Sequence, residues 1–474
     1  MLNALLSLAV TYDANQMLIG LVVGVIVLIV LVTMTKVPAF VAIILAAMLV
    51  ALIGGVPGGT IPGMISGGFG GTLGTIGIII GFGVIMGQIF EVSGAAERMA
   101  RTFIKLFGKG REELALALTG FIVSIPIFCD SAFVILFPIA KAISKKTRKN
   151  LVMLAGALAM GLVITHTMVP PTPGPLAVGA SFGVEIGTLI LWGLIVAIPM
   201  TIAGLFYIKW VSKSINIVPN EQGELVRLEV SGTTVFDFDI NEAPTKKLPG
   251  TFLSFAPILV PIILIVLNQV LKTAITGFGS TWIGGAFAFI GSPIPAVAVG
   301  VVIAIYGLGF GMQKEEALKH MDAGVRQAGI ILLVTGAGGS LGRVIQETGV
   351  GNTIANAIVG WGIPLIILPF FVATIVRFIQ GSGTVSLVTS ASITAPILLA
   401  AGANPVFGAL AAMVGGVFFG YFNDSYFHVV NRSIGITVPK EQLKFWSGAT
   451  TAAWAAGFVT ILILNAILGG VVGV

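Results

Sequence analysis

The chain has 474 residues, of which 56% are hydrophobic and only 9% are charged, and its formal net charge at pH 7 is +6. Soluble domains carry roughly 25% charged residues, so this composition excludes a soluble globular protein and indicates an integral membrane protein with many spans. The single cysteine, Cys129, excludes an internal disulfide.

Ten apolar segments are predicted to form spanning helices. Five lie at about 17–34, 38–55, 73–93, 151–180 and 187–208, and five at about 251–271, 285–308, 326–346, 404–435 and 447–472. Because Lys and Arg accumulate in cytoplasmic loops, the basic clusters at 98–111 and 141–149 orient this path with both termini outside. The residues before the first span include no Lys or Arg, so we expect a retained helix and not a cleaved signal peptide.

The segment between those two basic clusters must enter the membrane and return, because both of its ends are predicted to be cytoplasmic. A re-entrant hairpin at about 113–140, with its tip near Pro126–Asp130, satisfies this condition. Arms of about 12–14 residues are too short to cross about 30 Å of hydrocarbon, so two spanning helices with a tight turn fit poorly. A second hairpin is predicted at about 362–400, with Arg377–Thr384 at its middle.

Polar, helix-breaking stretches interrupt two of the predicted spans at matching places in the two halves of the chain. Thr165–Pro175 breaks the span at 151–180, and Asn423–Arg432 breaks the span at 404–435. Unwound backbone at membrane depth is tolerated only where protein or water satisfies it, and a duplicated break of this kind is typical of a substrate site between two repeats.

We therefore predict an all-α polytopic membrane protein made of two inverted repeats. Residues 1–208 form the first repeat and residues 251–474 the second, each with about five spanning helices, one re-entrant hairpin and one broken helix at the midplane. Gly87–Gly94 resembles Gly342–Gly349 in a helix of opposite predicted orientation, which favours this arrangement. The acidic stretch at 209–250 is predicted to be a cytoplasmic linker.

Both predicted hairpins place polar residues at their breaks. An ionisable group at membrane depth costs about 2.5–3.5 kcal/mol on insertion scales and so indicates function. Asp130 and Ser131 are expected to cap the second short helix of the first hairpin, leaving backbone N–H groups that face the site. Ser382, Gly383 and Thr384 offer the same geometry in the second hairpin.

Arg377 supplies a planar cation that can hold a carboxylate with two hydrogen bonds, so we expect a small carboxylate substrate. The alternative is that Arg377 only neutralises Asp130 or Asp424 as a structural ion pair. The candidate substrate-binding residues are Asp130, Ser131, His166, Thr172, Arg377, Ser382, Gly383, Thr384, Asn423 and Asp424.

Asp130, His166 and Asp424 are the candidate proton carriers, because histidine titrates near neutral pH and buried carboxyl groups can exchange protons there. For His166 the alternative is a fixed hydrogen-bond donor. Sodium remains a second candidate coupling ion, since unwound carbonyls and Ser, Thr and Asn side chains are hard oxygen ligands. The sequence predicts no cofactor, no metal-ligand motif and no nucleic-acid partner.

Four regions, Phe128–Pro138, His166–Pro175, Arg377–Thr384 and Asn423–Thr437, resemble the signature regions of the gluconate permease family within a larger superfamily of ion-coupled transporters. The resemblance implies a symporter of the bacterial inner membrane that imports gluconate or related sugar acids with protons. It also implies a homodimer and an elevator-type mechanism, in which a transport domain moves against a fixed scaffold.

The chain departs from the family pattern at the site itself. Thr172 stands where gluconate transporters commonly have a second histidine, Cys129 begins an altered Cys-Asp-Ser-Ala run, and Tyr426 occupies a position that is often glycine. Alternative functions are a sodium-coupled carboxylate or D-serine transporter, and a cation/proton antiporter without an organic substrate. An intramembrane enzyme is not predicted, because the chain lacks a catalytic constellation.

Overall fold

A computed structural model describes residues 13–107, 110–220, 222, 224–227, 248–275, 278–310, 312–351 and 364–470. Within these ranges the regular elements are helices, apart from two strands of three residues each, β1 (Ile217–Pro219) and β2 (Leu225–Arg227), which pair antiparallel. The prediction of an all-α architecture is therefore confirmed for the apolar part of the chain.

The first half contains helices at every predicted span, together with one helix that was not predicted. The bounds are α2 (Ala14–Met34), α3 (Ala39–Ile53), α4 (Ile61–Val92), α5 (Ala95–Phe107), α6 (Glu112–Val123), α7 (Cys129–Thr147), α8 (Leu151–Met168), α9 (Pro173–Phe182) and α10 (Ile186–Val211). The additional helix is α5, whose buried residues recur every three or four positions, including Met99, Ala100 and Phe103. It therefore packs through one apolar stripe.

The second half continues with α11 (Thr251–Ala274), α12 (Trp282–Ile290), α13 (Pro293–Ile303), α14 (Lys314–Thr348), α16 (Ile367–Gln380), α17 (Gly383–Ala400), α18 (Pro405–Gly415), α19 (Ser425–Ile434), α20 (Pro439–Gln442) and α21 (Gly448–Leu468). The predicted span at 285–308 is wrong as a straight helix. Its residues form α12, α13 and a π-helical turn at Ala304–Leu308, with a bend of 63° at the break before Pro293. Proline at this position is tolerated because its missing N–H belongs to the first turn of α13.

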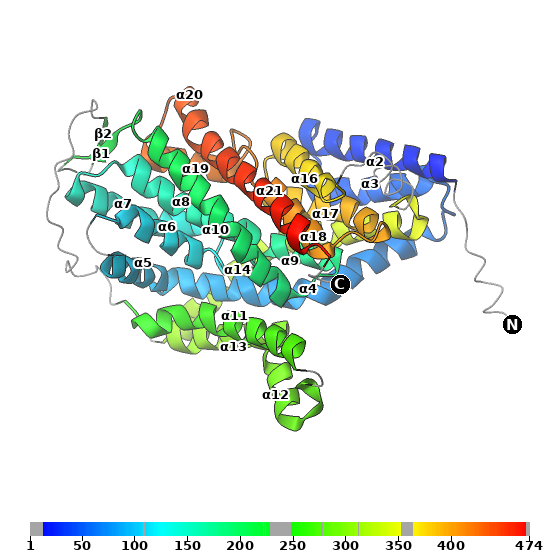
Figure 1. The fold of residues 1–474 in the computed structure, drawn as a ribbon, viewed down its shortest axis with the longest axis horizontal. Coiled ribbons are helices and arrows are strands. Elements are labelled where there is room, and N and C mark those ends of the chain that lie inside the picture. Colours follow the sequence, from blue (N-terminus) through cyan, green and yellow to red (C-terminus); the bar gives the residue numbers. More distant parts are fainter. Residues whose placement is uncertain are drawn as a thin grey trace.

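α4 and α14 pack against each other through the middle of the molecule, and both are longer than predicted (Figure 1). The glycine-rich sequence at 63–74 is part of α4 and does not interrupt it. The small residues let the backbones of α4 and α14 approach closely. A Cβ added at Gly68 would lie 2.5 Å from the carbonyl oxygen of Gly339. The hydroxyl of Ser340 donates a 2.8 Å hydrogen bond to the carbonyl of Ile65 across the same contact.

Seven of the described helical spans are long and apolar enough to cross a membrane, or eight if the bent pair α12–α13 counts as one, against ten predicted. α8 and α9 together count as one span. Three of the ten, α3, α18 and the described part of α2, are apolar but shorter, whereas α17, which is not among the ten, is long enough. Figure 1 shows α12 projecting away from the body of the molecule, beyond α11 and α13.

The helix pairs α6–α7 and α16–α17 occupy the positions of the two predicted hairpins. The first arms are short, with 12 residues in α6 and 14 in α16. The second arms are longer: α7 has 19 residues, more than predicted for that hairpin, and α17 has 18. α7 is longer because the helix continues through the basic cluster to Thr147, and α17 alone is long enough to cross a membrane. Residues 362 and 363 of the second hairpin lie outside the described residues.

The described part of the predicted linker is anchored to the first half of the chain. The side chain of Asn150 donates to the carbonyls of Ser212 (2.7 Å) and Ile215 (2.8 Å), and its oxygen accepts from the N–H of Val152 and Ile217. In the same region Lys149 forms ion pairs with Glu112 and Glu113. Most of the acidic stretch of the linker, at 228–247, lies outside the described residues.

Candidate functional site

A cavity of about 320 Å³ lies where the breaks of four helix pairs meet. Its lining comes from the α6–α7 break (128–130), the facing turns of α8 and α9 (163–174), the α16–α17 break (377–387) and the unwound segment between α18 and α19 (416–426). Segments more than 250 residues apart therefore form one site. The cavity is large enough for a small organic acid, whose polar groups would meet side chains from both halves of the chain.

Most of the predicted site residues line this cavity, and two do not. The lining includes Asp130, His166, Arg377, Ser382, Gly383, Thr384, Asn423 and Asp424. Ser131 is excluded because successive helix residues are turned by about 100°, so it leaves the face that Asp130 presents. Thr172 is buried, at 3% exposure, and its hydroxyl donates a 2.7 Å hydrogen bond to the carbonyl of Val169 in the turn between α8 and α9.

Arg377 and Asp424 form a buried ion pair at one end of the cavity. The distance from Arg377 Nη2 to Asp424 Oδ2 is 2.6 Å, and the side chains are 6% and 9% exposed. Arg377 lies in the last turn of α16, and Asp424 lies on the unwound segment, 47 positions further along the chain. Of the two partners left open by the sequence, the structure selects Asp424 and not Asp130.

Arg377 still has a donor to offer. Its Nε is buried and has no hydrogen-bond partner among the residues that the structure describes. A buried donor without a partner costs about 1–3 kcal/mol, so the arrangement is incomplete without a further acceptor. A carboxylate oxygen in the cavity would supply that acceptor, and a guanidinium is suited to hold it.

The helix caps differ from the prediction in one of the two hairpins. The Ser382 hydroxyl accepts from the N–H of Val385, so this residue caps α17 as predicted. Asp130 and Ser131 do not cap α7: the helix begins at Cys129, its N-cap is Phe128, and no side chain bonds there. The first N–H groups of α7 thus lack a side-chain cap, which leaves the positive end of this helix exposed to the cavity.

Asp130 and Asp424 have different surroundings although both carboxylates line the cavity. Asp424 has the cation Arg377 and also caps α19 by accepting from the N–H of Tyr426 at 3.1 Å. Asp130 accepts a 3.3 Å hydrogen bond from the Ser425 hydroxyl and has no ion pair in the described part of the chain. Asp130 is therefore the carboxylate whose charge is left without a protein cation.

His166 and Asn423 differ in whether their side-chain nitrogens are free to bind a ligand. Nδ1 of His166 is buried without a partner among the described side chains and backbone groups, and the ring lies 5.5 Å from the ring of Phe128. The amide nitrogen of Asn423 donates to the carbonyls of Phe378 (3.0 Å) and Ile379 (3.3 Å). His166 thus has a free nitrogen for a ligand, whereas the Asn423 amide nitrogen mainly holds the unwound segment against the end of α16.

Three further residues that line the cavity at the hairpin tips were not among the predicted site residues. Gly381 has φ +85°, and a Cβ there would lie 2.3 Å from the Asn423 carbonyl oxygen. Gln380 accepts the backbone N–H of Ser382 at 3.0 Å, and Ser425 binds Asp130. The Gly-Ser-Gly run after Arg377 indicated a break in the helix. The need for glycine at 381, however, comes from the carbonyl of Asn423, 42 residues further along the chain.

No group of three or more His, Cys, Asp and Glu side chains within the described ranges is arranged to hold a metal ion. The chemistry that the cavity offers is therefore hydrogen bonding and charge: one buried cation with an unused donor, one carboxylate without a cation, an uncapped helix N-terminus and a histidine nitrogen. Such a set can bind an anion that also carries hydroxyl groups.

Curated proteins similar to this chain are membrane permeases and transporters, not enzymes. An uncharacterized permease of Haemophilus influenzae is 46% identical over 402 residues, which cover 84% of this chain and 82% of the relative. A gluconate permease of Pseudomonas aeruginosa is 33% identical, with coverage of 84% and 86%. The inner membrane permease YgbN of Escherichia coli is 33% identical, with coverage of 82% and 85%.

The fold resembles that of solved transporters. The structure of the Alcanivorax borkumensis YdaH transporter superposes with a TM-score of 0.66, covering 90% of this chain and 98% of that one, at 11% sequence identity. The family model described as GntP family permease matches residues 16–467. The chain is thus a multi-pass protein of the bacterial inner membrane, and it belongs to the GntP permease family.

Proposed function

We propose that this permease imports a small hydroxy-carboxylate, gluconate or a related sugar acid, by secondary active transport coupled to protons. The observation that carries the proposal is the buried Arg377, which lines the cavity and whose Nε has no acceptor among the described residues. The name of the Pseudomonas aeruginosa relative, gluconate permease, supports this substrate class.

In the proposed complex the substrate carboxylate accepts from Arg377 and from the first N–H groups of α7 and α17. The positive ends of these helices favour an anion by about 0.3–1 kcal/mol each in exposed settings. His166 Nδ1 and the Ser425 hydroxyl then bind hydroxyl groups further along the substrate. This arrangement uses donors from both halves of the chain, so binding depends on the hairpin tips staying together.

Asp130 is the proposed principal proton carrier, with His166 and Asp424 as further candidates. Asp130 lines the same cavity as the substrate anion and has no protein cation beside it within the described residues. Two negative charges close together repel, so protonation of Asp130 favours substrate binding and bound substrate favours protonation. That reciprocity is what couples the two fluxes.

The proposed mechanism is of the elevator type. Two helix pairs at the predicted hairpin positions and two broken helices at matching places support an inverted-repeat arrangement. We assign the two hairpins and broken helices to the moving domain, and α4 and α14 to the scaffold of a homodimer. Both assignments are testable by cross-linking between α4 and α9 in different transport states.

Substrate binding at several pH values tests the proposed coupling. Purified protein should bind labelled gluconate more tightly as the pH falls from 8 to 6, and Asp130→Asn should bind it with little dependence on pH. Asp130→Glu, which keeps the titrating group, is the matched control. Absence of gluconate binding at every pH would contradict the proposal.

Two alternatives make different predictions in the same assay. Binding that follows sodium and not protons would favour sodium coupling. Binding of D-serine in place of gluconate would favour an amino-acid substrate, for which the carboxylate of Asp130, without a protein cation in the described chain, would hold the ammonium group.

A further inference from the structure

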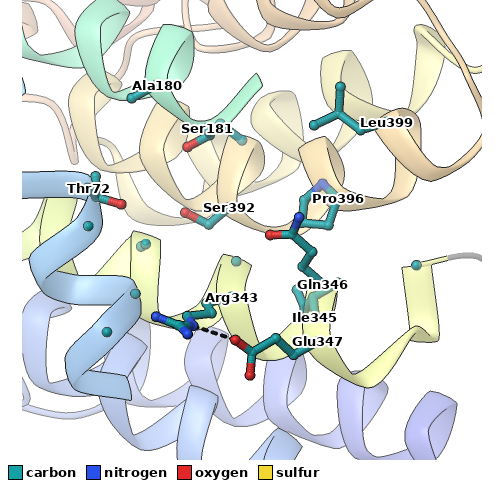
Figure 2. Close-up of a pocket in the computed structure, with 18 of the residues that line it drawn as sticks. Thr72, Ala180, Ser181, Arg343, Ile345, Gln346, Glu347, Ser392, Pro396 and Leu399 are labelled. Carbon is teal, nitrogen blue, oxygen red and sulfur yellow. Dashed lines mark hydrogen bonds and ion pairs between the residues drawn. The ribbon is translucent and has the colours of Figure 1, made fainter. Parts of the chain in front are cut away.

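A second, larger cavity of about 900 Å³ lies beside the central one. It is bounded by α4 and α14 on one side and by α9 and α17 on the other. Figure 2 shows Thr72 of α4, Arg343 of α14, Ser181 of α9 and Ser392 of α17 around the same space. Glycines of α4 and α14 form much of its wall, so the cavity remains open and polar backbone reaches its surface.

The two cavities are neighbours along the same two helices. On α17 the lining of the central cavity ends at Leu387, and that of the second cavity begins at Ala391. Four helix residues correspond to a rise of about 6 Å. On α9 the corresponding residues are Gly174 and Ala180. In the predicted topology the C-terminal end of α17 faces outward, so the second cavity lies on the outer side of the central one.

Arg343 and Glu347 are the charged residues in the described lining of the second cavity. Arg343 Nε lies 2.6 Å from Glu347 Oε1, and the two side chains are 43% and 41% exposed. Neither Nη nitrogen of Arg343 has an acceptor within the described ranges. The guanidinium lies against α4, where a Cβ added at Gly67 would come 2.0 Å from Nη1. Gly67 therefore leaves the room that the guanidinium occupies.

An exposed ion pair of this kind contributes only about 0–1 kcal/mol, so Glu347 does not hold the arginine against a competing acceptor. A guanidinium has five N–H donors, and its Nε/Nη edge and its Nη/Nη edge can each donate two hydrogen bonds to a carboxylate. Glu347 engages the Nε donor, and the Nη edge is left for a second anion. An arginine placed this way in a chain with 9% charged residues needs a reason beyond surface solvation.

We propose that the second cavity is an additional anion-binding site, in which the Nη edge of Arg343 holds the carboxylate of an organic acid before it enters the central cavity. The substrate class rests on the proposed function. Hydroxyl groups of the acid would bind Ser181, Ser392 and Gln346, which line the same space. Glu347 limits the site to ligands of low charge, because a second carboxylate on the ligand would face it.

Charge-selective labelling of a cysteine beside Arg343 tests this site without requiring transport. Gln346 lies three residues after Arg343 on α14, so their Cβ atoms are about 5–6 Å apart. Gln346→Cys is made in a Cys129→Ala background, since Cys129 is the only native cysteine. The purified protein is labelled with an anionic (sulfonatoethyl) and a cationic (trimethylammonium-ethyl) methanethiosulfonate, and the ratio of the two rates is measured with and without gluconate.

Arg343→Gln should lower the anionic-to-cationic rate ratio at least about threefold, because a unit charge near the reacting sulfur attracts one reagent and repels the other. Arg343→Lys should keep most of the ratio. Lys272→Gln is the matched control: it removes a positive charge near the end of α11, outside both cavities, and should leave the ratio unchanged. Gluconate should slow labelling in the parent and not in Arg343→Gln.

An unchanged ratio in Arg343→Gln would overturn the proposal. The proposal would also be overturned if gluconate did not slow the labelling. Gluconate would be used at concentrations that saturate the central cavity, and this saturation would be measured as the binding that depends on Arg377. If the protein does not bind gluconate at all, gluconate is not the substrate, and the proposed function is contradicted. The ratio of the two labelling rates alone then tests whether the second cavity is an anion site.

Discussion

Removing Arg377 should separate its two roles, as counter-ion of Asp424 and as binder of the substrate carboxylate. Arg377→Gln leaves Asp424, whose side chain is 9% exposed, without its cation. Breaking a buried ion pair by removing one partner costs about 3–5 kcal/mol, and we expect the lower end because Asp424 keeps its hydrogen bond from the N–H of Tyr426. The single variant should therefore unfold at a clearly lower temperature.

Asp424→Asn in the same protein should restore most of that stability, because no buried charge then lacks a partner. It should not restore substrate binding. A hydrogen bond to a charged group contributes about 1.5–3 kcal/mol, so loss of the guanidinium lowers gluconate affinity about 10-fold to 150-fold. The assays are thermal unfolding followed by tryptophan fluorescence and equilibrium binding of labelled gluconate, on wild type, both single variants and the double variant.

A double variant that binds gluconate within about threefold of wild type would show that Arg377 does not hold the substrate. Arg377 would then serve only to neutralise Asp424, which is the structural alternative that the sequence left open. Recovery of stability without recovery of affinity is the result that the geometry predicts.

Two further predictions concern the hairpin tip and the basic loop. Gly381→Ala should abolish gluconate binding and lower stability, because φ is +85° and the new Cβ would lie 2.3 Å from a carbonyl oxygen. Gly402→Ala is the control: its φ is +66° but the space around it is open, so it should lower stability by only about 1–3 kcal/mol and keep gluconate binding. Lys149→Met should lower the unfolding temperature at pH 7, whereas Lys141→Met should not. Burial raises the pKa of Glu112, but hydrogen bonds from Lys149 and the Gly110 N–H outweigh it, so the pKa lies below its usual 4.5. The stability that this pair contributes is thus present above pH 4.5 and lost as the pH falls through the lowered pKa, so wild type and Lys149→Met should converge there; a constant difference down to pH 3 would contradict this.

The site was largely predictable because its residues are charged or polar in segments that are otherwise apolar. In a chain with so few charges, Asp130, His166, Arg377 and Asp424 stand out individually, and the structure brings them to one cavity. Ser382 was predictable as a cap because serine before a helix has a local role. These signals depend on residue chemistry and short spacing, which the sequence displays directly.

The errors arise where tertiary packing decides the outcome. The predicted start of α4 at residue 73 is wrong because its glycines pack against α14, and glycine in isolation indicates a break. Thr172 was selected because it stands where gluconate transporters commonly have a second histidine, yet its hydroxyl bonds to the carbonyl of Val169 and it does not line the cavity. The choice between Asp130 and Asp424 as partner of Arg377 also needed the arrangement of the unwound segment in space.

Uptake of gluconate driven by a proton gradient is the decisive measurement of proton-coupled transport by this permease. Labelled gluconate would be offered to proteoliposomes containing the purified protein, with an inward proton gradient and no sodium, and Arg377→Gln as the negative control. The wild-type protein should accumulate gluconate, the protonophore should collapse this accumulation, and Arg377→Gln should show none. Uptake that persists with the protonophore present, or that appears only with a sodium gradient, would contradict proton-coupled transport.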